Sequence, residues 1–475
     1  MDYCFIQPPS SLLLEDKVMP PLGILYLASW LRKHGHNVCI IDLAGVNDWR
    51  EELRTNINED KLVDSDIIGL TATTPQYNLA IQIAAVIRDR LGDNKYFYNN
   101  TSIRRYIVGG IHITSLAHNN DLVFSHNQVF DSYCVGEGFN AVTKMAEEFT
   151  YMPRIYTEPI IKDVNELPFA ARDLIDIKNY KYKLGDVPAT TFYSQWGCIY
   201  NCSYCESPMA GSYTVRAMTP QRIQDEIRHI RDEFGIHGIM FFDDELNLDK
   251  KRTLGICEKI KELGDITWRG FMVTAKFDEE IANACKESNC YEVASGIESG
   301  SPKILRNIKK PATVELNKKF LITAKKAGLR TKAFMIIGLP GESWMTIKES
   351  YNFLKNLGEF APDDCDFSIL QVYPGAPIYQ NPMDVEFDSF ENYDKMYYKS
   401  SPDSYTDLIQ IKTKAMEKYD LVAARNFMEY IFKKRGWIKE YSDRKDLDEV
   451  YKKDNVIDSI KYACQKLDIP FDSIL

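Results

Sequence analysis

The sequence predicts an α/β protein built from three parts. The first is an N-terminal flavodoxin-like domain of the Rossmann type, the second a partial (β/α)6 barrel resembling the TIM barrel, and the third a small, mostly α-helical C-terminal region. Short apolar runs alternate with amphipathic stretches over the first 150 residues, and a second alternation with six apolar runs begins near Pro188. The length of 475 residues also exceeds what one hydrophobic core usually supports.

Five apolar runs are expected to form the strands of the N-terminal domain, which we assign to residues 1–150. These strands are expected at residues 2–7, 38–42, 66–71, 105–109 and 132–135. Between the first two, residues 21–35 should form a helix, because a proline stands near its first turn and a glycine past its end. Five strands with intervening helices suit a doubly wound sheet, which binds ligands at the carboxyl ends of its strands.

Residues 151–187 are expected to form an interdomain linker, because the alternation weakens there and prolines accumulate. The barrel then occupies residues 188–380, with strands expected at 191–195, 238–242, 267–273, 291–297, 331–337 and 365–372. The clearest helix runs from 220 to 234, with Thr219 as its cap and one apolar face. The loops that follow the strands of such a barrel carry its chemistry. Residues 381–475 form the helical C-terminal region.

Composition and charge exclude several function classes. The chain has 58 Lys and Arg against 68 Asp and Glu, a net charge of −10, so nothing favours broad binding to nucleic acid. The N-terminus does not resemble a signal peptide and no apolar run reaches about 18 residues, so we expect a cytoplasmic protein without a membrane span. Eleven cysteines, an odd number over a long chain, do not suit a secreted disulfide framework.

Three of these cysteines, Cys198, Cys202 and Cys205, stand within eight residues, just after the first expected barrel strand. Three thiolates on one loop can ligate three irons of a 4Fe-4S cluster and leave the fourth iron open to a substrate. A structural zinc site would need a fourth protein ligand, and no Cys or His lies at the spacing of a zinc finger. Plain core packing of three cysteines is the other alternative.

The cysteine spacing, with Tyr204 before the last cysteine, resembles the signature of the radical S-adenosylmethionine (SAM) superfamily. The resemblance implies that the three cysteines hold a 4Fe-4S cluster, which cleaves SAM reductively to a 5′-deoxyadenosyl radical. It also implies a partial (β/α)6 barrel, in agreement with the six units counted from the sequence. Three later segments, 241–245, 296–300 and 334–342, resemble the family's SAM-binding motifs in their usual order. The residues expected to contact SAM are Tyr204, Asp243, Asp244, Glu245, Glu298, Ile337 and Gly338.

Each SAM-binding segment has a structural alternative. The acidic run 243–245 could be a solvated loop, Glu298 could cap the following helix, and residues 338–341 could be an ordinary turn. Arg269 and Lys276 are weaker candidates for SAM contacts, and a surface role suits either of them equally well.

The N-terminal domain resembles the cobalamin-binding domains that are fused to radical SAM barrels. The segments that carry this resemblance are 4–9, 19–28, 32–36, 108–114 and 135–138. Glycine permits the backbone to approach a large ligand closely at the carboxyl ends of strands. The residues expected to line the cobalamin site are Pro8, Pro9, Leu22, Gly23, Thr71, Thr73, Thr74, Gly109, Gly110, His112, Gly136, Glu137 and Gly138.

One departure from other cobalamin proteins concerns the ligand below the cobalt. Cobalamin mutases and methionine synthase present an Asp-x-His-x-x-Gly loop after the first strand, whereas residues 8–20 contain no histidine here. The resemblance therefore implies base-off cobalamin without a histidine ligand. His112 is expected to make a polar contact with the cofactor or to be a buried structural histidine. The threonines of the expected site could equally be turn residues.

These features predict a cobalamin-dependent radical SAM enzyme of the methyltransferase-like class. It would move a methyl group from methylcobalamin to an unactivated carbon of a small-molecule substrate, with an electron donor such as flavodoxin or ferredoxin. Alternatives are a non-methylating enzyme that rearranges or cyclises its substrate, a non-catalytic corrinoid sensor, and a methylthiotransferase-like enzyme, to whose additional cluster cysteines Cys4, Cys39 and Cys134 correspond loosely. The C-terminal aromatic residues that could close the substrate end of the barrel are Tyr393, Tyr397, Tyr398 and Trp437.

Overall fold

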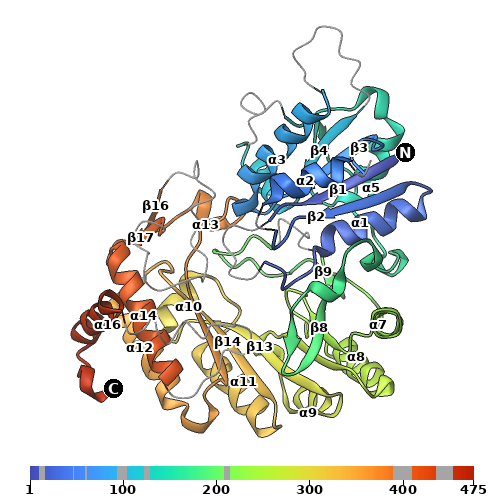
Figure 1. Ribbon diagram of the computed structural model, residues 1–475. Helices are drawn as coiled ribbons and strands as arrows, with labels where there is room; N and C mark the ends of the chain where they lie inside the picture. The colour runs from blue at the N-terminus through green and yellow to red at the C-terminus, as the bar shows by residue number, and fades with distance from the viewer. Residues whose placement is uncertain are drawn as a thin grey trace.

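The computed structural model describes residues 1–9, 16–46, 48–58, 61–93, 104–121, 129–207, 214–388, 409–434 and 453–474. Two large sheets, one in each half of the chain, dominate these residues, and helices cover their faces (Figure 1). The predicted α/β class is confirmed. Tyr393, Tyr397, Tyr398 and Trp437 lie outside the described residues.

The first sheet has the strand order of a flavodoxin-like domain. Its strands are β1 (Asp2–Gln7), β2 (Asn37–Asp42), β3 (Ile67–Thr71), β4 (Arg105–Gly109), β5 (Ser132–Cys134) and β6 (Ile155–Tyr156). They are parallel and lie in the order β2-β1-β3-β4-β5-β6. The five expected strands are present, and β6 adds an edge strand from the segment expected to be a linker.

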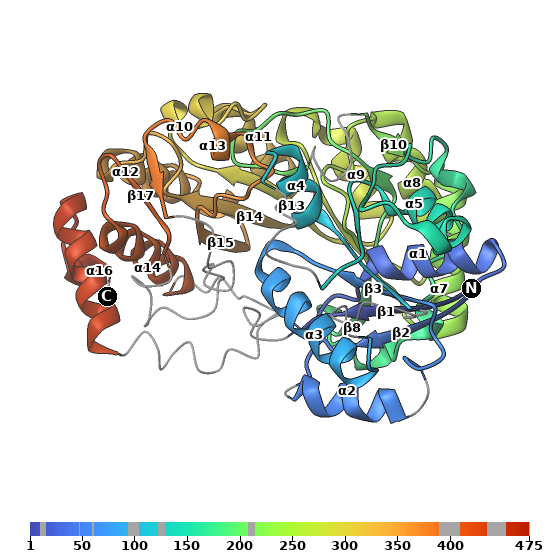
Figure 2. The same cartoon turned by 90° about the horizontal axis from the view of Figure 1, so that it is seen from above.

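Alternate residues of β1 enter two separate cores, as the two-residue period of a strand requires. Tyr3 and Phe5 join the core under α1 (Leu22–Lys33) and α5 (Gly138–Glu147), whereas Cys4 and Ile6 join the core that includes α3 (Tyr77–Arg90). Figure 2 shows α2 (Trp49–Asn58) and α3 on one side of the sheet and α1 and α5 on the other. In a doubly wound sheet of this kind, ligands bind at the carboxyl ends of the strands.

The second sheet is an open barrel of six parallel strands with one antiparallel addition. Its strands are β7 (Lys183–Leu184), β8 (Val187–Phe192), β11 (Gly238–Phe241), β12 (Thr267–Phe271), β13 (Cys290–Glu298), β14 (Arg330–Ile337) and β15 (Asp364–Ile369). The order is β15-β14-β13-β12-β11-β8-β7, with β7 antiparallel to β8. Because β15 and β7 are opposite edges of this sheet, the barrel stays open. The predicted partial (β/α)6 barrel is confirmed.

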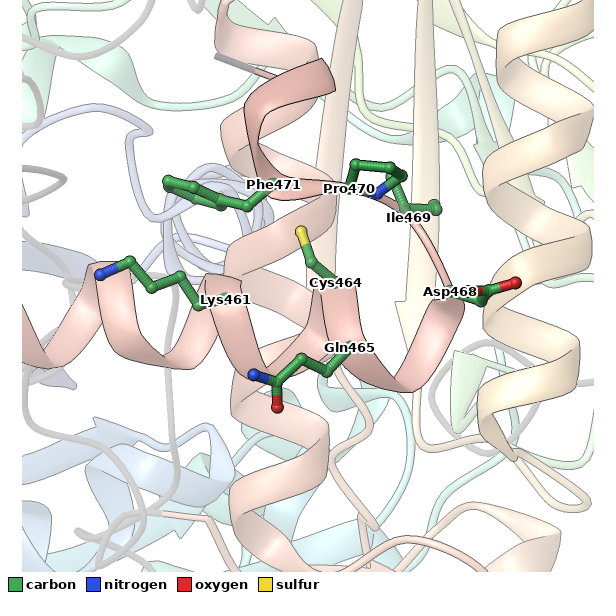
Figure 3. A pocket seen from close by; sticks show the side chains of 7 residues that line it. All are labelled: Lys461, Cys464, Gln465, Asp468, Ile469, Pro470 and Phe471. Carbon is green, nitrogen blue, oxygen red and sulfur yellow. The ribbon is translucent and has the colours of Figure 1, made fainter.

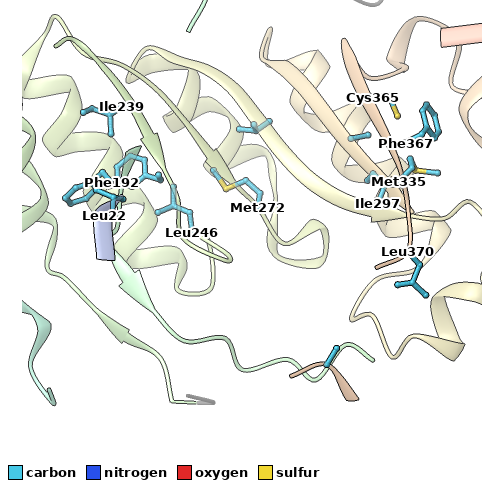
Figure 4. Close-up of a cluster of buried hydrophobic side chains, with 14 of the residues drawn as sticks. Leu22, Phe192, Ile239, Leu246, Met272, Ile297, Met335, Cys365, Phe367 and Leu370 are labelled. Carbon is cyan, nitrogen blue, oxygen red and sulfur yellow. The ribbon is translucent and has the colours of Figure 1, made fainter. Parts of the chain in front are cut away.

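Helices cover the outer face of this barrel. They are α7 (Pro220–Phe234), α8 (Lys250–Leu263), α9 (Glu279–Glu287), α10 (Pro302–Asn307), α11 (Val314–Lys326) and α12 (Trp344–Asn356). The α7 helix spans the expected residues, and Thr219 caps it by accepting a hydrogen bond from the Arg222 amide at 3.3 Å. Figure 4 shows Phe192 of β8, Ile239 of β11, Ile297 of β13 and Met335 of β14 in the buried core of this half of the molecule.

The C-terminal region packs against the last barrel strand. It contains α13 (Pro377–Gln380), the antiparallel pair β16 (Val385–Phe387) and β17 (Ile411–Thr413), α14 (Lys418–Lys434) and α16 (Asp454–Leu467). The ring of Phe432 on α14 stacks on Phe367 of β15, with 5.1 Å between ring centroids. No helix among the described residues is long and apolar enough to cross a membrane. The division at residues 150, 187 and 380 stays a prediction.

A buried ion pair joins three segments that are far apart in the sequence. Arg172 and Glu226 are 0% exposed, and their side chains approach to 3.5 Å. Arg172 also donates to the Thr191 carbonyl at 2.7 Å, and the Tyr26 hydroxyl of α1 donates to Glu226 at 3.0 Å. The pair therefore ties the first domain, the 151–187 segment and the barrel to one another.

Replacing Arg172 with alanine is expected to lower the free energy of unfolding by about 1–3 kcal/mol, because it removes the donor to the buried Thr191 carbonyl and one of the two guanidinium groups beside Glu226, while Arg222 stays 3.0 Å from that carboxylate. Arg32→Ala is the matched control, since the Arg32–Asp173 pair is exposed and should contribute below about 1 kcal/mol. Urea denaturation of both variants measures the difference. Equal midpoints would contradict the role assigned to the buried pair.

Candidate functional site

The cysteine loop leaves the barrel directly after β9 (Gln195–Trp196), which pairs with β10 (Arg216–Ala217). Gly197 turns the chain there with φ +89°, a left-handed conformation that suits glycine. The Ser203 amide donates to the Ile308 carbonyl beyond α10 at 2.9 Å, and the Ser203 carbonyl accepts from the Ile378 amide of α13 at 2.7 Å. Two later segments of the chain therefore hold the loop in place.

The three thiols of this loop are largely protected from solvent. Cys198 and Cys202 are each 8% exposed, and Cys205 is half-buried. Burial raises the pKa of Cys198 to about 11 and that of Cys202 to about 12, and it also raises the pKa of Cys205. The Ser207 amide donates to the Cys205 sulfur at 3.4 Å. Metal binding at such a loop displaces the thiol protons, and amide contacts of this kind tune iron–sulfur centres.

The donor set tests which metal group this loop fits. Among the described residues, no three His, Cys, Asp or Glu side chains gather into a site for a single metal ion. A zinc ion would draw its sulfur ligands to about 2.3 Å from one centre, whereas in a 4Fe-4S cluster each thiolate binds a different iron. Three thiols without a fourth protein ligand fit a cluster with one open iron better than zinc.

Glu298 occupies the end of β13 in an uncommon backbone conformation, with φ +61°. Its carboxylate is 5% exposed, accepts a hydrogen bond from the Tyr204 hydroxyl at 2.8 Å and pairs with the Lys310 ammonium at 3.2 Å. A Cβ at Gly296 would lie 2.0 Å from Glu298 Oε1, so only glycine leaves room for this carboxylate. These partners account for Glu298 better than the alternative that it caps α10. Strain at such a residue is typical of functional sites.

Lys310 was not expected from the sequence. Its side chain is 12% exposed, and burial disfavours its charge, but the carboxylates of Glu298 and Glu245 raise its pKa above the usual value. It also lies beside the cysteine loop, because the carbonyl of the preceding residue, Lys309, is 4.0 Å from the Cys202 sulfur. Glu245 is half-buried, and burial raises its pKa to about 7 against the opposing effect of Lys310. Lys310 thus remains a cation between the thiols and the carboxylates.

Asp243 holds the backbone that leads into the cysteine loop. It is 1% exposed, and its Oδ1 accepts from the amides of Ser194 at 2.7 Å and Gln195 at 3.1 Å. The Ser194 hydroxyl donates to its other oxygen, and Arg252 donates to that hydroxyl at 2.7 Å. Burial raises the Asp243 pKa to about 6. The solvated-loop alternative fits Asp244, which is exposed, but not Asp243.

The other residues predicted to contact SAM differ in burial and in partners. Ile337 is 3% exposed and packs in the core, and Gly338 turns the chain after β14 with φ +89°. Arg269 is buried and pairs with Glu292 at 3.3 Å, so a surface role for it is wrong. Lys276 is exposed and donates to a backbone carbonyl at 2.8 Å, in agreement with a surface role.

The residues predicted to line a cobalamin site gather at the carboxyl edge of the first sheet. Pro8 follows β1 and accepts a hydrogen bond from the Gln76 side chain at 2.9 Å. Pro9 is half-buried and Leu22 buried, whereas nothing lies within 4 Å of a Cβ built at Gly23. Thr71, the last residue of β3, is half-buried, whereas Thr73 is exposed and Thr74 is buried.

Four glycines of this edge divide into two kinds. Gly110 has φ +110°, and a Cβ there would lie 2.6 Å from the Ala72 carbonyl oxygen, so it allows the loops after β3 and β4 to touch. Gly109 and Gly138 likewise face protein atoms at 3.2 Å. Gly136 has φ +85°, and no described atom lies within 4 Å of the position where a Cβ would be. An uncovered glycine at the carboxyl edge of a sheet leaves room for a large ligand.

His112 is 0% exposed and held by neighbours of its own domain. Its Nδ1 lies 3.1 Å from the Thr74 hydroxyl, and its ring lies 4.6 Å from the Tyr77 ring. Burial lowers its pKa to about 3, so the imidazole is neutral near pH 7. The arrangement matches the alternative of a buried, hydrogen-bonded structural histidine.

Protonation of His112 is expected to destabilise the protein in acid. Its folded pKa of about 3 lies below the ordinary value of 6.5, so its stabilising contribution is complete above pH 6.5 and lost as the pH falls toward 3. Between pH 6.5 and pH 5 this amounts to about 2 kcal/mol. Urea denaturation over this range should therefore show a smaller pH effect in His112→Gln than in the wild type. Identical pH profiles would contradict the shift.

Glu137 does not face an open ligand site. Its two oxygens accept from the Ile161 amide at 2.6 Å and pair with Arg216 of β10 at 2.7 Å. Arg216 also donates to the Ile161 carbonyl at 2.5 Å. Glu137 therefore ties the first domain to the hairpin at the base of the cysteine loop.

The first domain meets the cysteine loop through α4 (Ile111–His118). Its Ser115 hydroxyl donates to Glu206, the residue after Cys205, at 3.3 Å. Beyond α4, Asn119 accepts from the Gln380 side chain of α13 at 2.6 Å. Neither Ser115 nor Glu206 stood out in the sequence, because they are 91 positions apart and belong to no shared motif. Their contact places the glycine-lined edge of the first sheet opposite the cysteine loop.

The cysteines that a methylthiotransferase would use do not come together. Cys4 and Cys39 are register partners on β1 and β2, but Cys134 lies on β5, beyond β3 and β4 in the sheet. A shared cluster of these three thiols is therefore inconsistent with the fold.

A cavity lies near the C-terminal end of the chain, away from the cysteine loop and the first sheet. It has a volume of about 430 Å³ between α16 and the turn that follows it (Figure 3). It is lined by Lys461, Cys464, Gln465, Asp468, Ile469, Pro470 and Phe471. Because α16 packs on α12 and α14, far from β8 in both views, this cavity takes no part in the site (Figures 1 and 2).

Comparison with known proteins agrees with this geometry. Residues 193–354, which run from the end of β8 into α12, match the radical SAM superfamily. An uncharacterized methyltransferase of Pyrococcus horikoshii is 31% identical over 401 residues, covering 80% of this chain and 83% of that protein.

Two solved structures share the fold. The cobalamin-dependent S-adenosylmethionine radical enzyme OxsB, with aqua-cobalamin and SAM bound, matches with a TM-score of 0.68 and 15% identity over 95% of this chain and 70% of its own. The radical SAM methyltransferase TsrM from Kitasatospora setae, with tryptophan and a SAM analogue bound, matches with a TM-score of 0.63 and 17% identity over 79% and 74%. The resemblance seen in the sequence is thereby confirmed. The chain belongs to the same family as the Pyrococcus protein, and its barrel is a radical SAM domain, which implies SAM and a 4Fe-4S cluster as cofactors.

Proposed function

We propose that the protein transfers a methyl group from methylcobalamin to an unactivated carbon of a small-molecule substrate. The contact of Ser115 with Glu206 carries this proposal, because it joins the edge of the cobalamin-type domain to the residue beside Cys205. A methyl donor and a SAM cleavage site can then serve one substrate carbon at the junction of the two halves. The Pyrococcus relative, which is named a methyltransferase, supports methyl transfer over rearrangement.

Cys198, Cys202 and Cys205 would hold the cluster, which when bound supplies the electron that cleaves SAM. Glu298 would bind the ribose or methionine part of SAM, with Tyr204 and Lys310 fixing its carboxylate. The Lys310 charge would also offset the negative charge of the thiolates near it. Asp243 would act indirectly, by holding the backbone that leads into the cysteine loop.

The first sheet would hold cobalamin in the base-off form, without a histidine below the cobalt. The segment after β1 contains no histidine, and His112 is engaged with Thr74 and Tyr77. The corrin would lie at the carboxyl edge of the sheet, which is supported by the lack of any described atom within 4 Å of a Cβ at Gly23 or Gly136. Glu137 would support this edge through Arg216 and would not touch the cofactor.

The reaction also needs an electron from outside the chain. We assign this role to a carrier such as flavodoxin or ferredoxin, and the reducing cytoplasm suits an oxygen-sensitive cluster. The tryptophan bound to TsrM is an example of a small-molecule substrate in a protein of this fold. The cofactor chemistry is common to such proteins, whereas the substrate depends on the residues around the site.

Anaerobic reconstitution with iron, sulfide, SAM and cobalamin, with dithionite as the source of electrons, tests the proposal. Mass spectrometry of candidate substrates should show a gain of one methyl group, together with release of S-adenosylhomocysteine and 5′-deoxyadenosine. Release of 5′-deoxyadenosine with a changed but unmethylated substrate would contradict methyl transfer. It would select the alternative of a rearranging or cyclising enzyme instead.

A further inference from the structure

We propose that Lys303, Arg306 and Lys309 form a docking surface for a small acidic electron-carrier protein. We call these three residues the basic patch. The inference rests on the proposed function, because only a cluster that must be reduced needs such a partner. It goes further by assigning the partner to one face of the molecule.

The basic patch is a local excess of positive charge on an acidic protein. The three side chains are exposed and follow one another at intervals of three residues, along α10 and just past its end. Within the described part of the chain, no carboxylate forms an ion pair with any of them, although Lys303 Nζ donates to the Gly341 carbonyl at 3.0 Å. The chain as a whole has a net charge of −10. Lys310, by contrast, points inward to Glu298 at 3.2 Å. Among the described residues, the exposed charges of Arg306 and Lys309 are therefore available to an external partner, and Lys303 adds a third positive charge beside them.

The same stretch of backbone forms one wall of the cysteine loop. The Ile308 carbonyl accepts from the Ser203 amide at 2.9 Å, and the Lys309 carbonyl lies 4.0 Å from the Cys202 sulfur. The loop itself reaches the surface, since Ile199 is 50% exposed. A protein docked on the basic patch would thus be separated from the thiols by little more than this backbone.

A transient electron carrier needs proximity and fast association more than tight binding. Complementary charge supplies this, because it raises the association rate and orients the encounter. An acidic carrier with a reduced flavin or iron–sulfur centre fits these requirements. That centre gives up one electron and is oxidised, and the electron reduces SAM at its sulfur–C5′ bond. The bond breaks to methionine and a 5′-deoxyadenosyl radical, so charge and atoms balance.

The first test measures binding of a purified acidic flavodoxin to the cluster-free chain by biolayer interferometry. The combined variant Lys303→Glu, Arg306→Glu and Lys309→Glu should raise the Kd for flavodoxin by at least about tenfold. Wild-type binding should weaken as salt is added, because the charges are exposed. The control variant carries Lys178→Glu, Lys181→Glu and Lys183→Glu, which make the same change in charge. These exposed lysines precede the amino end of β8, whereas the cysteine loop follows its carboxyl end. Equal loss in both variants would overturn the proposal.

The second test uses the cluster-loaded protein and two electron donors. With reduced flavodoxin, the patch variant should form 5′-deoxyadenosine at least about tenfold more slowly than the wild type, and with dithionite at the same rate. Unchanged flavodoxin-driven rates, or equal losses with both donors, would overturn the docking surface. A wild-type protein that cleaves no SAM even with dithionite would instead contradict the proposed function, which keeps the two failures distinct.

Discussion

Cys202→Ala is expected to abolish 5′-deoxyadenosine formation while leaving the chain folded. The thiol is one of only three on its loop, so its loss removes an iron ligand that no neighbouring side chain replaces among the described residues. The loop backbone is held independently, by Ser203 to Ile308 and Ile378. Chromatography of products, iron content and circular dichroism measure the three parts of the expectation.

Cys464→Ala provides the matched control for this prediction. Cys464 is also a buried cysteine, 2% exposed, but it lies on α16 at the C-terminal edge. The control should keep its iron and its rate of SAM cleavage, with a small loss of stability from the lost packing. Full iron content and normal SAM cleavage in Cys202→Ala would contradict the assignment of the cluster.

Gly296→Ala is expected to reduce SAM cleavage by at least about a hundredfold, equivalent to about 2.7 kcal/mol. The added Cβ would lie 2.0 Å from Glu298 Oε1 and 2.8 Å from Lys310 Nζ, so the carboxylate must leave its position. Its contacts with Tyr204 and Lys310 are then lost. Equilibrium binding of SAM and the rate of 5′-deoxyadenosine formation should fall together.

Gly255→Ala tests whether an added methyl group is harmful in itself. A Cβ at Gly255 in α8 would meet the ring of Pro220 at 3.0 Å, away from the cysteine loop, and alanine favours a helix. We expect near wild-type SAM cleavage from this variant.

Tyr204→Phe should give an intermediate loss of SAM cleavage, because it removes one hydrogen bond to Glu298 and keeps the ring. Normal SAM affinity in Gly296→Ala would show that Glu298 has another role.

Local patterns in the sequence predict much of the fold. Strand and helix periods are properties of neighbouring residues, so β1, β14 and α7 lie where the apolar pattern places them. The first barrel strand is an instructive difference. It was expected at 191–195 but ends at Phe192, because residues 195–196 leave the barrel to pair with β10. The short β6 was missed within a proline-rich segment.

Contacts between distant segments account for most of what the sequence could not predict in the site. Lys310 and Glu298 lie on either side of α10 in the sequence, and their ion pair depends on how the chain returns to the end of β13 after this helix. Glu137 lies within a glycine-rich motif, but its ion pair with Arg216 depends on how two sheets meet. The motif predicts that a residue lies near the site, whereas burial and partners decide whether its side chain can reach a ligand.

Metal analysis of the anaerobically reconstituted protein tests the central claim most directly, because it asks whether one chain carries both metal cofactors. We expect about four irons and one cobalt per chain, with the iron lost in Cys202→Ala and the cobalt retained. Iron without cobalt would contradict the cobalamin site at the edge of the first sheet. One zinc in place of the irons would contradict the cluster.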